Sequence, residues 1–183
     1  STENSNSIDM VLLLNGFPIV AIELKNQLTG QSVDNAKKQY MYDRNPKELC
    51  FQFNHRFLVY FAVDLYEVAM TTELKGDNTY FLPFNQGSNG AGNVGGAGNP
   101  TNEDGYTTSY LWEKVLQKDI LLDILQRYMH LSEETKTDIK TGKKKVIRKL
   151  IFPRYHQLDV VTKILADVKE NGSGKNYLIQ HSA

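Results

Sequence analysis

Two apolar runs rich in β-branched residues open the chain, at residues 8–14 and 17–25, and the dipeptide Asn15-Gly16 separates them. Asn-Gly between two such runs is the strongest short-range signal for a β-hairpin. Residues 32–44 then follow a helical spacing, with Ser32 placed to cap the start of the helix. The pattern predicts a hairpin followed directly by a helix.

The middle of the chain alternates strand-like and helix-like patterns. Residues 57–63 are almost continuously apolar, which is typical of a strand buried on both faces. Residues 68–74 and 79–84 predict a second hairpin, and Pro83 places its far end at the edge of a sheet. Apolar residues at helical spacing over 110–131 predict one or two helices that cover the core.

The remaining segments read as connections and as the start of another unit. Residues 87–105 hold seven of the thirteen glycines, so we expect a long mobile surface loop there, with a ligand-gripping loop as the alternative. The basic stretch 140–149 is predicted as a solvated linker, with a phosphate-binding patch as the alternative. Beyond it, residues 150–155 and 177–179 are strand-like and 157–169 are helix-like.

Composition narrows the class of protein. The 21 basic and 21 acidic residues balance, so any attraction to nucleic acid must be local. A single cysteine and four scattered histidines argue against a disulfide or a structural zinc site. No apolar run approaches the roughly 20 residues of a membrane span, and the polar start is not a signal peptide. We expect a cytoplasmic protein, and the lack of an initial Met suggests a fragment of a longer one.

The candidate chemistry lies in Glu23-Leu24-Lys25, with Asp9 fourteen residues upstream. Acid-x-Lys occurs five times in this chain, so only its context gives it meaning. Glu23 and Lys25 share one face of a strand. A plain two-residue turn would pair Asp9 with Ile22, whereas a longer loop or a bulge would place Asp9 opposite Glu23. Catalysis therefore requires the longer loop or the bulge.

Two facing carboxylates suggest a cation between them, because like charges directly opposite destabilise a sheet. Asp9, Glu23 and the carbonyl of Leu24 could bind Mg²⁺ for phosphodiester hydrolysis, with Lys25 orienting water or offsetting negative charge. In the alternative, Asp9 caps a strand end, and Glu23 and Lys25 form an exposed pair.

Other polar residues are weighed beside this trio. Glu73-Leu74-Lys75 runs into a turn and is predicted to lie on the surface. On the following helix, Lys38, Gln39, Tyr42 and Arg44 could reach phosphates or bases, and a solvent-facing stripe is the alternative. Gln39 could also hydrogen-bond a ligand carboxylate or the scissile strand.

The order of Asp9, Glu23-x-Lys25 and Gln39 resembles the PD-(D/E)xK nuclease superfamily. The longer segments GFPIVAIELKN, FLVYFAVD, MTTELKG and LIFPRYHQLD resemble the restriction (R) subunit of type I restriction-modification enzymes. The resemblance implies Mg²⁺-dependent endonucleolytic cleavage of double-stranded DNA, with modification and specificity subunits as partners. It places Asp9, Glu23 and Lys25 on catalytic positions. Gln39 matches a Gln that relatives follow with Tyr four residues on, where this chain has Asp43.

The same resemblance implies an ATP-driven superfamily 2 helicase-type motor after the nuclease. Residues 152–157 look like its Q motif, in which Gln157 would read the adenine of ATP, and 177–180 match the strand before a phosphate-binding loop. A GxGKS/T run would come next in relatives.

The fold expected is therefore α/β, in three parts. A PD-(D/E)xK nuclease-like mixed sheet flanked by helices spans residues 1–86. The Gly/Asn-rich loop, helical cover and basic linker span 87–149, and an incomplete RecA-like motor domain begins in 150–183. A non-catalytic DNA-binding or coupling module and a stand-alone repair-type nuclease are the alternatives.

Overall fold

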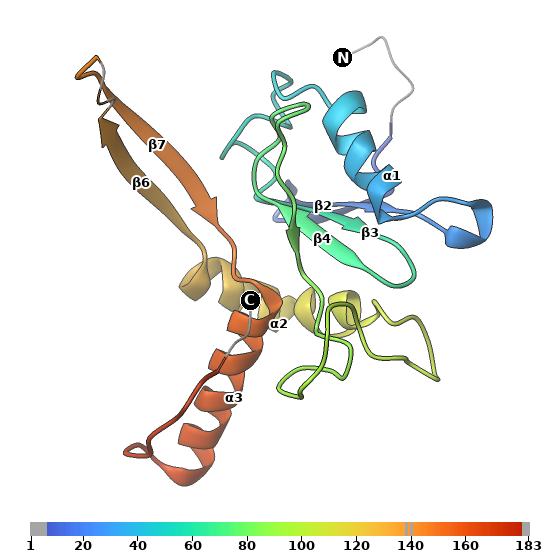
Figure 1. Ribbon diagram of the computed structural model, residues 1–183, viewed down its shortest axis with the longest axis vertical. Coiled ribbons are helices and arrows are strands. Elements are labelled where there is room, and N and C mark those ends of the chain that lie inside the picture. The colour runs from blue at the N-terminus through green and yellow to red at the C-terminus, as the bar shows by residue number, and fades with distance from the viewer. Residues whose placement is uncertain (1–6, 138, 140, 181–183) are drawn as a thin grey trace.

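A five-stranded mixed sheet organises the chain (Figure 1). The structure is a computed structural model and describes residues 7–137, 139 and 141–180. The strands lie in the order β1-β2-β3-β4-β5; β2 and β3 are parallel and the other pairs antiparallel. Their bounds are Met10–Leu14, Phe17–Leu24, Val59–Val63, Val68–Thr71 and Leu82–Pro83. The expected α/β class with a mixed sheet and helices is confirmed.

Helices cover both faces of this sheet. Near the N-terminus they are the 3₁₀ turn η1 (Gln27–Thr29), α1 (Val33–Lys38) and the π-helical turn η2 (Gln39–Asp43). The later helices are η3 (Leu111–Val115), α2 (Lys118–Asp123), η4 (Ile124–Tyr128) and α3 (Tyr155–Asn171). Between η4 and α3, β6 (His130–Thr137) and β7 (Lys144–Ile151) form a separate two-stranded ribbon.

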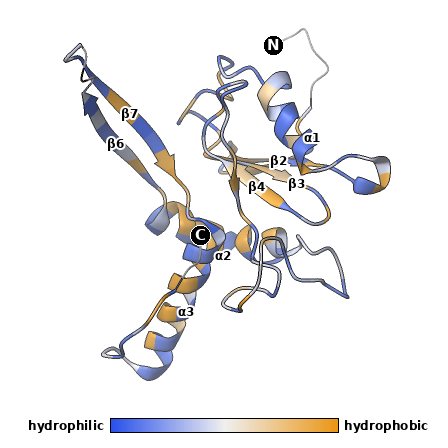
Figure 2. Ribbon diagram, in the orientation of Figure 1, coloured by the Kyte–Doolittle hydropathy of each residue, from blue (hydrophilic) through white to orange (hydrophobic). Residues whose placement is uncertain are grey.

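Two hydrophobic clusters result, one on each side of the sheet, because successive strand residues point to opposite faces. On one side Ala21, Tyr60 and Ala62 pack against α1 and η2. On the other side Ile22 and Phe61 pack with residues of η3, α2, η4 and α3. All five residues of β3 are buried, which confirms the prediction of a central strand buried on both faces. Figure 2 shows the apolar colouring of these central strands.

Several local predictions are also confirmed. Asn15 and Gly16 both have positive φ, as the tight turn of a hairpin requires. The predicted helix over 32–44 exists, although its second half is π-helical. Pro83 lies on the edge strand β5, and residues 87–105 contain neither helix nor strand.

Two expectations about the C-terminal third are wrong. Residues 144–149 belong to strand β7 and are not an irregular linker, since cross-strand pairing with β6 outweighs the poor strand preference of lysine. Residues 177–180 do not form a strand, because no strand within the described residues pairs with them. The domain boundaries themselves stay a prediction. No helix in the described residues is both long enough and apolar enough to cross a bilayer.

Candidate active site

A β-bulge sets the position of the first candidate carboxylate. Near the hairpin turn Leu14 pairs with Phe17 and Leu13 with Pro18, but beyond it Leu12 pairs with Val20, so Ile19 is an extra residue in β2. The turn itself has two residues. The bulge shifts the register by one, and the pair Met10–Ile22 is followed by the position where Asp9 faces Glu23. Catalysis requires either a longer loop or a bulge, and the structure has the bulge.

The three predicted residues converge at the end of β2. The backbone N–H of Leu24 donates a hydrogen bond of 2.8 Å to Asp9 Oδ2. Lys25 Nζ lies 3.9 Å from the same oxygen, and its side chain is only 12% exposed. Glu23 is near enough for the charge of Asp9 to raise its pKa. Asp9, Glu23 and Lys25 therefore form one cluster, with Asp9 at its solvent-exposed side.

Glu23 is fully buried and forms an ion pair with Arg44, which follows η2. Arg44 Nη2 and Nε donate to Glu23 Oε1 at 2.5 and 3.1 Å, and Nη2 also donates to the carbonyl of Ser7 at 2.5 Å. Burial raises the pKa of Glu23, while the hydrogen bond and charge of Arg44 oppose that rise. The orientation of Glu23 is therefore fixed by a cation from the next helix.

Arg44 is the residue that sequence reasoning placed wrongly. It was expected among groups that reach out to phosphates, but it is 3% exposed. The position of Arg44 along the helix is the pattern that indicates its burial. Ala36, Tyr40 and Arg44 recur every four residues on the buried face of the helix, so Arg44 continues the core-facing stripe. The Tyr40 hydroxyl donates to the carbonyl of Phe61 at 3.3 Å. Burial, followed by the charge of Glu23, raises the pKa of Tyr40.

The oxygen atoms present suit a hard divalent cation. Glu23 Oε2 is buried, and no hydrogen-bond donor contacts it within the described part of the chain. An unpartnered buried carboxylate oxygen is costly, and a cation would satisfy it. The described residues contain no group of three or more His, Cys, Asp or Glu at metal-binding distance. Magnesium does not need such a group, since one or two carboxylates with water and substrate oxygens suffice. The residues therefore fit the predicted Mg²⁺, with the Leu24 carbonyl as the further candidate ligand.

The remaining sequence candidates have no hydrogen bond or ion pair to Asp9, Glu23 or Lys25 within the described residues. Gln39 begins η2 and is half-buried, and within residues 7–137 no hydrogen bond joins its side chain to Asp9, Glu23 or Lys25. Tyr42 is exposed. Glu73 and Lys75 pair with each other at 2.6 Å, and Lys75 is half-exposed, which agrees with the predicted surface position.

Gln157 lies in the first turn of α3. Its side-chain oxygen accepts a hydrogen bond of 2.9 Å from the backbone N–H of Arg154. The side chain thereby caps the helix start. Its predicted contact with adenine stays a prediction.

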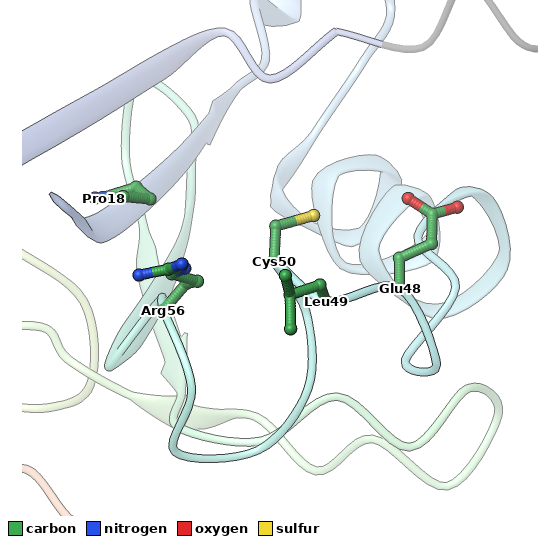
Figure 3. A pocket seen from close by; sticks show the side chains of 5 residues that line it. All are labelled: Pro18, Glu48, Leu49, Cys50 and Arg56. Carbon is green, nitrogen blue, oxygen red and sulfur yellow. The ribbon is translucent and has the colours of Figure 1, made fainter. Parts of the chain in front are cut away.

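A pocket of about 400 Å³ lies near the turn end of β2 and contains none of the predicted site residues (Figure 3). It is lined by Pro18, Glu48, Leu49, Cys50 and Arg56. Burial raises the pKa of the Cys50 thiol, which keeps it protonated and poorly nucleophilic at neutral pH. The candidate chemistry is thus at the opposite end of β2.

The family model described as type I restriction enzyme R protein N terminus matches residues 1–79. No curated protein and no solved structure matches the chain significantly. The matched region contains Asp9, Glu23, Lys25, Gln39 and Arg44, and it ends before the Gly-rich loop.

Proposed function

Because residues 1–79 belong to the family of type I restriction enzyme R protein N termini, we propose that this region is the nuclease of an R subunit and cleaves double-stranded DNA with the help of Mg²⁺. The proposal covers the PD-(D/E)xK assignment, which rests on the order of Asp9, Glu23 and Lys25. The observation that carries it is the bulge at Ile19, which turns Asp9 toward Glu23. A hairpin of the same length without the bulge would separate these residues.

Each residue has a role that follows from its position. Asp9 and Glu23 would hold the ion from opposite strands, with the Leu24 carbonyl completing the protein ligands. When bound, Mg²⁺ acidifies a water and stabilises the charge that develops on the phosphate. Lys25, with its ammonium 3.9 Å from Asp9, offsets negative charge at the attacked phosphate and orients the water. Arg44 keeps the Glu23 carboxylate in one orientation.

The wider enzyme is proposed on the family alone. The R subunit would act with modification and specificity subunits, which choose the DNA site. An ATP-driven motor would follow the nuclease along the chain, with Gln157 reading adenine. For that contact Gln157 must exchange its present hydrogen bond to Arg154 for one to the nucleotide.

The test is cleavage of plasmid DNA by the full-length subunit with its partner subunits, Mg²⁺ and ATP. Lys25→Ala should abolish cleavage and leave ATPase activity near that of the wild type. Lys75→Ala, in the second Glu-Leu-Lys tripeptide, is the matched control and should cleave normally. Equal cleavage by both variants would refute the proposed role of Lys25. Loss of ATPase activity together with cleavage would indicate misfolding instead.

The ion pair between Glu23 and Arg44 favours a second candidate, a non-catalytic DNA-binding or coupling module in which the carboxylate is structural. The two candidates differ in metal binding. The nuclease should bind Mn²⁺ and lose that binding in Asp9→Asn. The structural module should bind no Mn²⁺ and still fold.

A further inference from the structure

The β6–β7 ribbon projects from the body of the protein as a separate arm (Figure 1). Its two strands pair over eight residues each, from His130–Ile151 at the base to Thr137–Lys144 near the tip. Only Leu150 is buried along its length. At the base, the Thr72 hydroxyl donates a hydrogen bond of 2.7 Å to the Leu150 carbonyl. The arm is therefore anchored at one end and surrounded by solvent elsewhere.

An exposed two-stranded ribbon has little stability of its own. Such ribbons are marginal in water unless a third strand or another element packs on them. Neither β6 nor β7 pairs with any other strand among the described residues. The ribbon is about 27 Å long, because each strand has eight residues and each residue adds roughly 3.4 Å. Its form suggests that it gains further contacts from a binding partner.

Cations concentrate on one face of the arm. Lys136 and Lys145 are directly opposite across the two strands, and Lys149 follows four residues on, so all three side chains share that face. Like charges directly opposite destabilise a ribbon. Lys136 pairs with Glu134 at 3.9 Å, which leaves Lys145 and Lys149 in excess on this face; on the other face Arg148 pairs with Glu133 at 2.6 Å, which leaves only Lys144 in excess among the described residues of the ribbon. The lysine face therefore keeps a positive excess.

We propose that this face, made of Lys136, Lys145 and Lys149 and called here the lysine face, binds the phosphates of double-stranded DNA. The proposal deepens the proposed nuclease function and rests on it for the identity of the polyanion. Lysines 145 and 149 are about 14 Å apart along β7, four residues at roughly 3.4 Å. That spacing is close to the ~12 Å width of the major groove, so a ribbon that lies across the groove would place one lysine near each of its walls. Both lysines can therefore reach phosphates on the two sides of the groove.

The chemistry of the contact is general to duplex DNA. Lysine ammonium groups bind phosphate oxygens without reading sequence. Two further residues lie on the same side of the ribbon as the lysine face: Ser132, which pairs with Lys149, and Ile147, which pairs with Glu134. With one large aliphatic residue between its charges, this face is poorly suited to insertion into a membrane. The arm is thus expected to hold the duplex regardless of sequence.

The test is binding of a 30-base-pair duplex to the full chain at several salt concentrations, by fluorescence anisotropy without divalent ions. The variant carries Lys136→Gln, Lys145→Gln and Lys149→Gln. The matched control carries Lys47→Gln, Lys118→Gln and Lys169→Gln, three exposed lysines elsewhere. Both lose the same net charge. Circular dichroism and thermal unfolding check that both remain folded.

The ribbon variant should bind DNA at least tenfold more weakly at low salt. The slope of log K against log salt should fall by about 2.7, or 0.9 for each of three lost phosphate contacts. The control should change either quantity by much less. Equal effects in both variants, or no effect in the ribbon variant, would overturn the proposal. Loss of binding to phosphatidylserine vesicles with unchanged DNA binding would overturn it in favour of a membrane.

Because no divalent ion is present, this measurement does not depend on cleavage. If the lysine face binds DNA but no metal-dependent cleavage occurs in the full enzyme, the nuclease proposal fails and the arm proposal stands. If cleavage occurs and the ribbon variant binds DNA normally, the arm proposal fails and the nuclease proposal stands.

Discussion

Replacing Arg44 with Met should destabilise the protein through Glu23, which lies in the same buried contact. Methionine has nearly the length of arginine's aliphatic part and no charge, so the substitution removes the cation with little loss of packing. It leaves a fully buried carboxylate without an ion-pair partner among the described residues, since Lys25 pairs with Asp9. It also removes the hydrogen bond from Arg44 to the Ser7 carbonyl.

The expected loss follows from that burial. Removing one partner of a buried ion pair costs about 3–5 kcal/mol, because the other charge stays desolvated. The lost bond to Ser7 contributes about 1 kcal/mol within that range. Protonation of Glu23 limits the loss, since a neutral carboxyl no longer needs the cation. We therefore expect about 3 kcal/mol near pH 7.

The loss should depend on pH in a defined direction. The pKa of Glu23 is already raised above its ordinary value of 4.5, chiefly by burial, and removal of Arg44 raises it further. A raised pKa in the folded state stabilises the fold fully below pH 4.5, and this contribution is lost as pH rises through the folded-state pKa. The variant should consequently be closest to the wild type near pH 4.5 and fall further below it toward pH 8.

Urea unfolding of the wild type, Arg44→Met, Glu23→Gln and the double variant, at several pH values, measures both effects. Arg44→Met should cost much less when Glu23 is already Gln, because no charge is left unpaired. The matched control is Arg56→Met, whose guanidinium lies outside the core, over the ring of Phe17. A loss below about 1 kcal/mol at pH 7, or the same loss in the Glu23→Gln background, would refute the reasoning.

Three further predictions concern the hairpin, its metal and the core. Gly16→Ala should cost about 1 kcal/mol in urea unfolding, because Gly16 has φ +83° while a Cβ there would meet nothing within 4 Å. Gly96→Ala, at ordinary φ and with only an ordinary contact of 3.7 Å to Ser88 Oγ, is the comparison, and an equal cost would contradict the backbone explanation. Mn²⁺ at 100 times its Kd should stabilise the wild type by about 2.7 kcal/mol in thermal unfolding and leave Asp9→Asn unchanged, whereas stabilisation of both would place the metal elsewhere. Phe61→Ala should cost about 3–5 kcal/mol in urea unfolding, because its ring is fully buried against Phe84 and Phe152, and a loss under 1 kcal/mol would mean that this core is loosely packed.

The sequence was sufficient for the parts of the fold that depend on local chemistry. Asn15-Gly16 needs positive φ at two successive residues, and this fixes the hairpin turn. The all-apolar run around Phe61 can be satisfied only between two packed layers. The turn and the buried strand each depend on a few consecutive residues, so both structures can be predicted from the residue types.

What the sequence left open depends on distant partners. The bulge at Ile19 could be stated only as a condition for catalysis, since no local pattern distinguishes it from a three-residue loop. Arg44 was placed in solvent because a charged side chain is seldom buried without a partner, and its partner lies 21 residues away. The lysines of β7 gave no strand signal, since the residues that they pair with lie in another strand, β6.

The extra residue Ile19 in β2 determines which residues of the two hairpin strands face each other. Removing Ile19 alone would leave a regular hairpin in which Leu13 still pairs with Pro18 and Leu12 with Val20, so Asp9 would still face Glu23. Closing the bulge without removing a residue would instead pair Asp9 with Ile22 and turn it away from Glu23. An odd number of residues separates Asp9 from Glu23, and a two-residue turn can pair them only if one residue stays unpaired. An insertion or deletion of one residue between them therefore preserves the pairing only if the bulge is lost or a second one is gained, which is a constraint that amino-acid substitution does not impose.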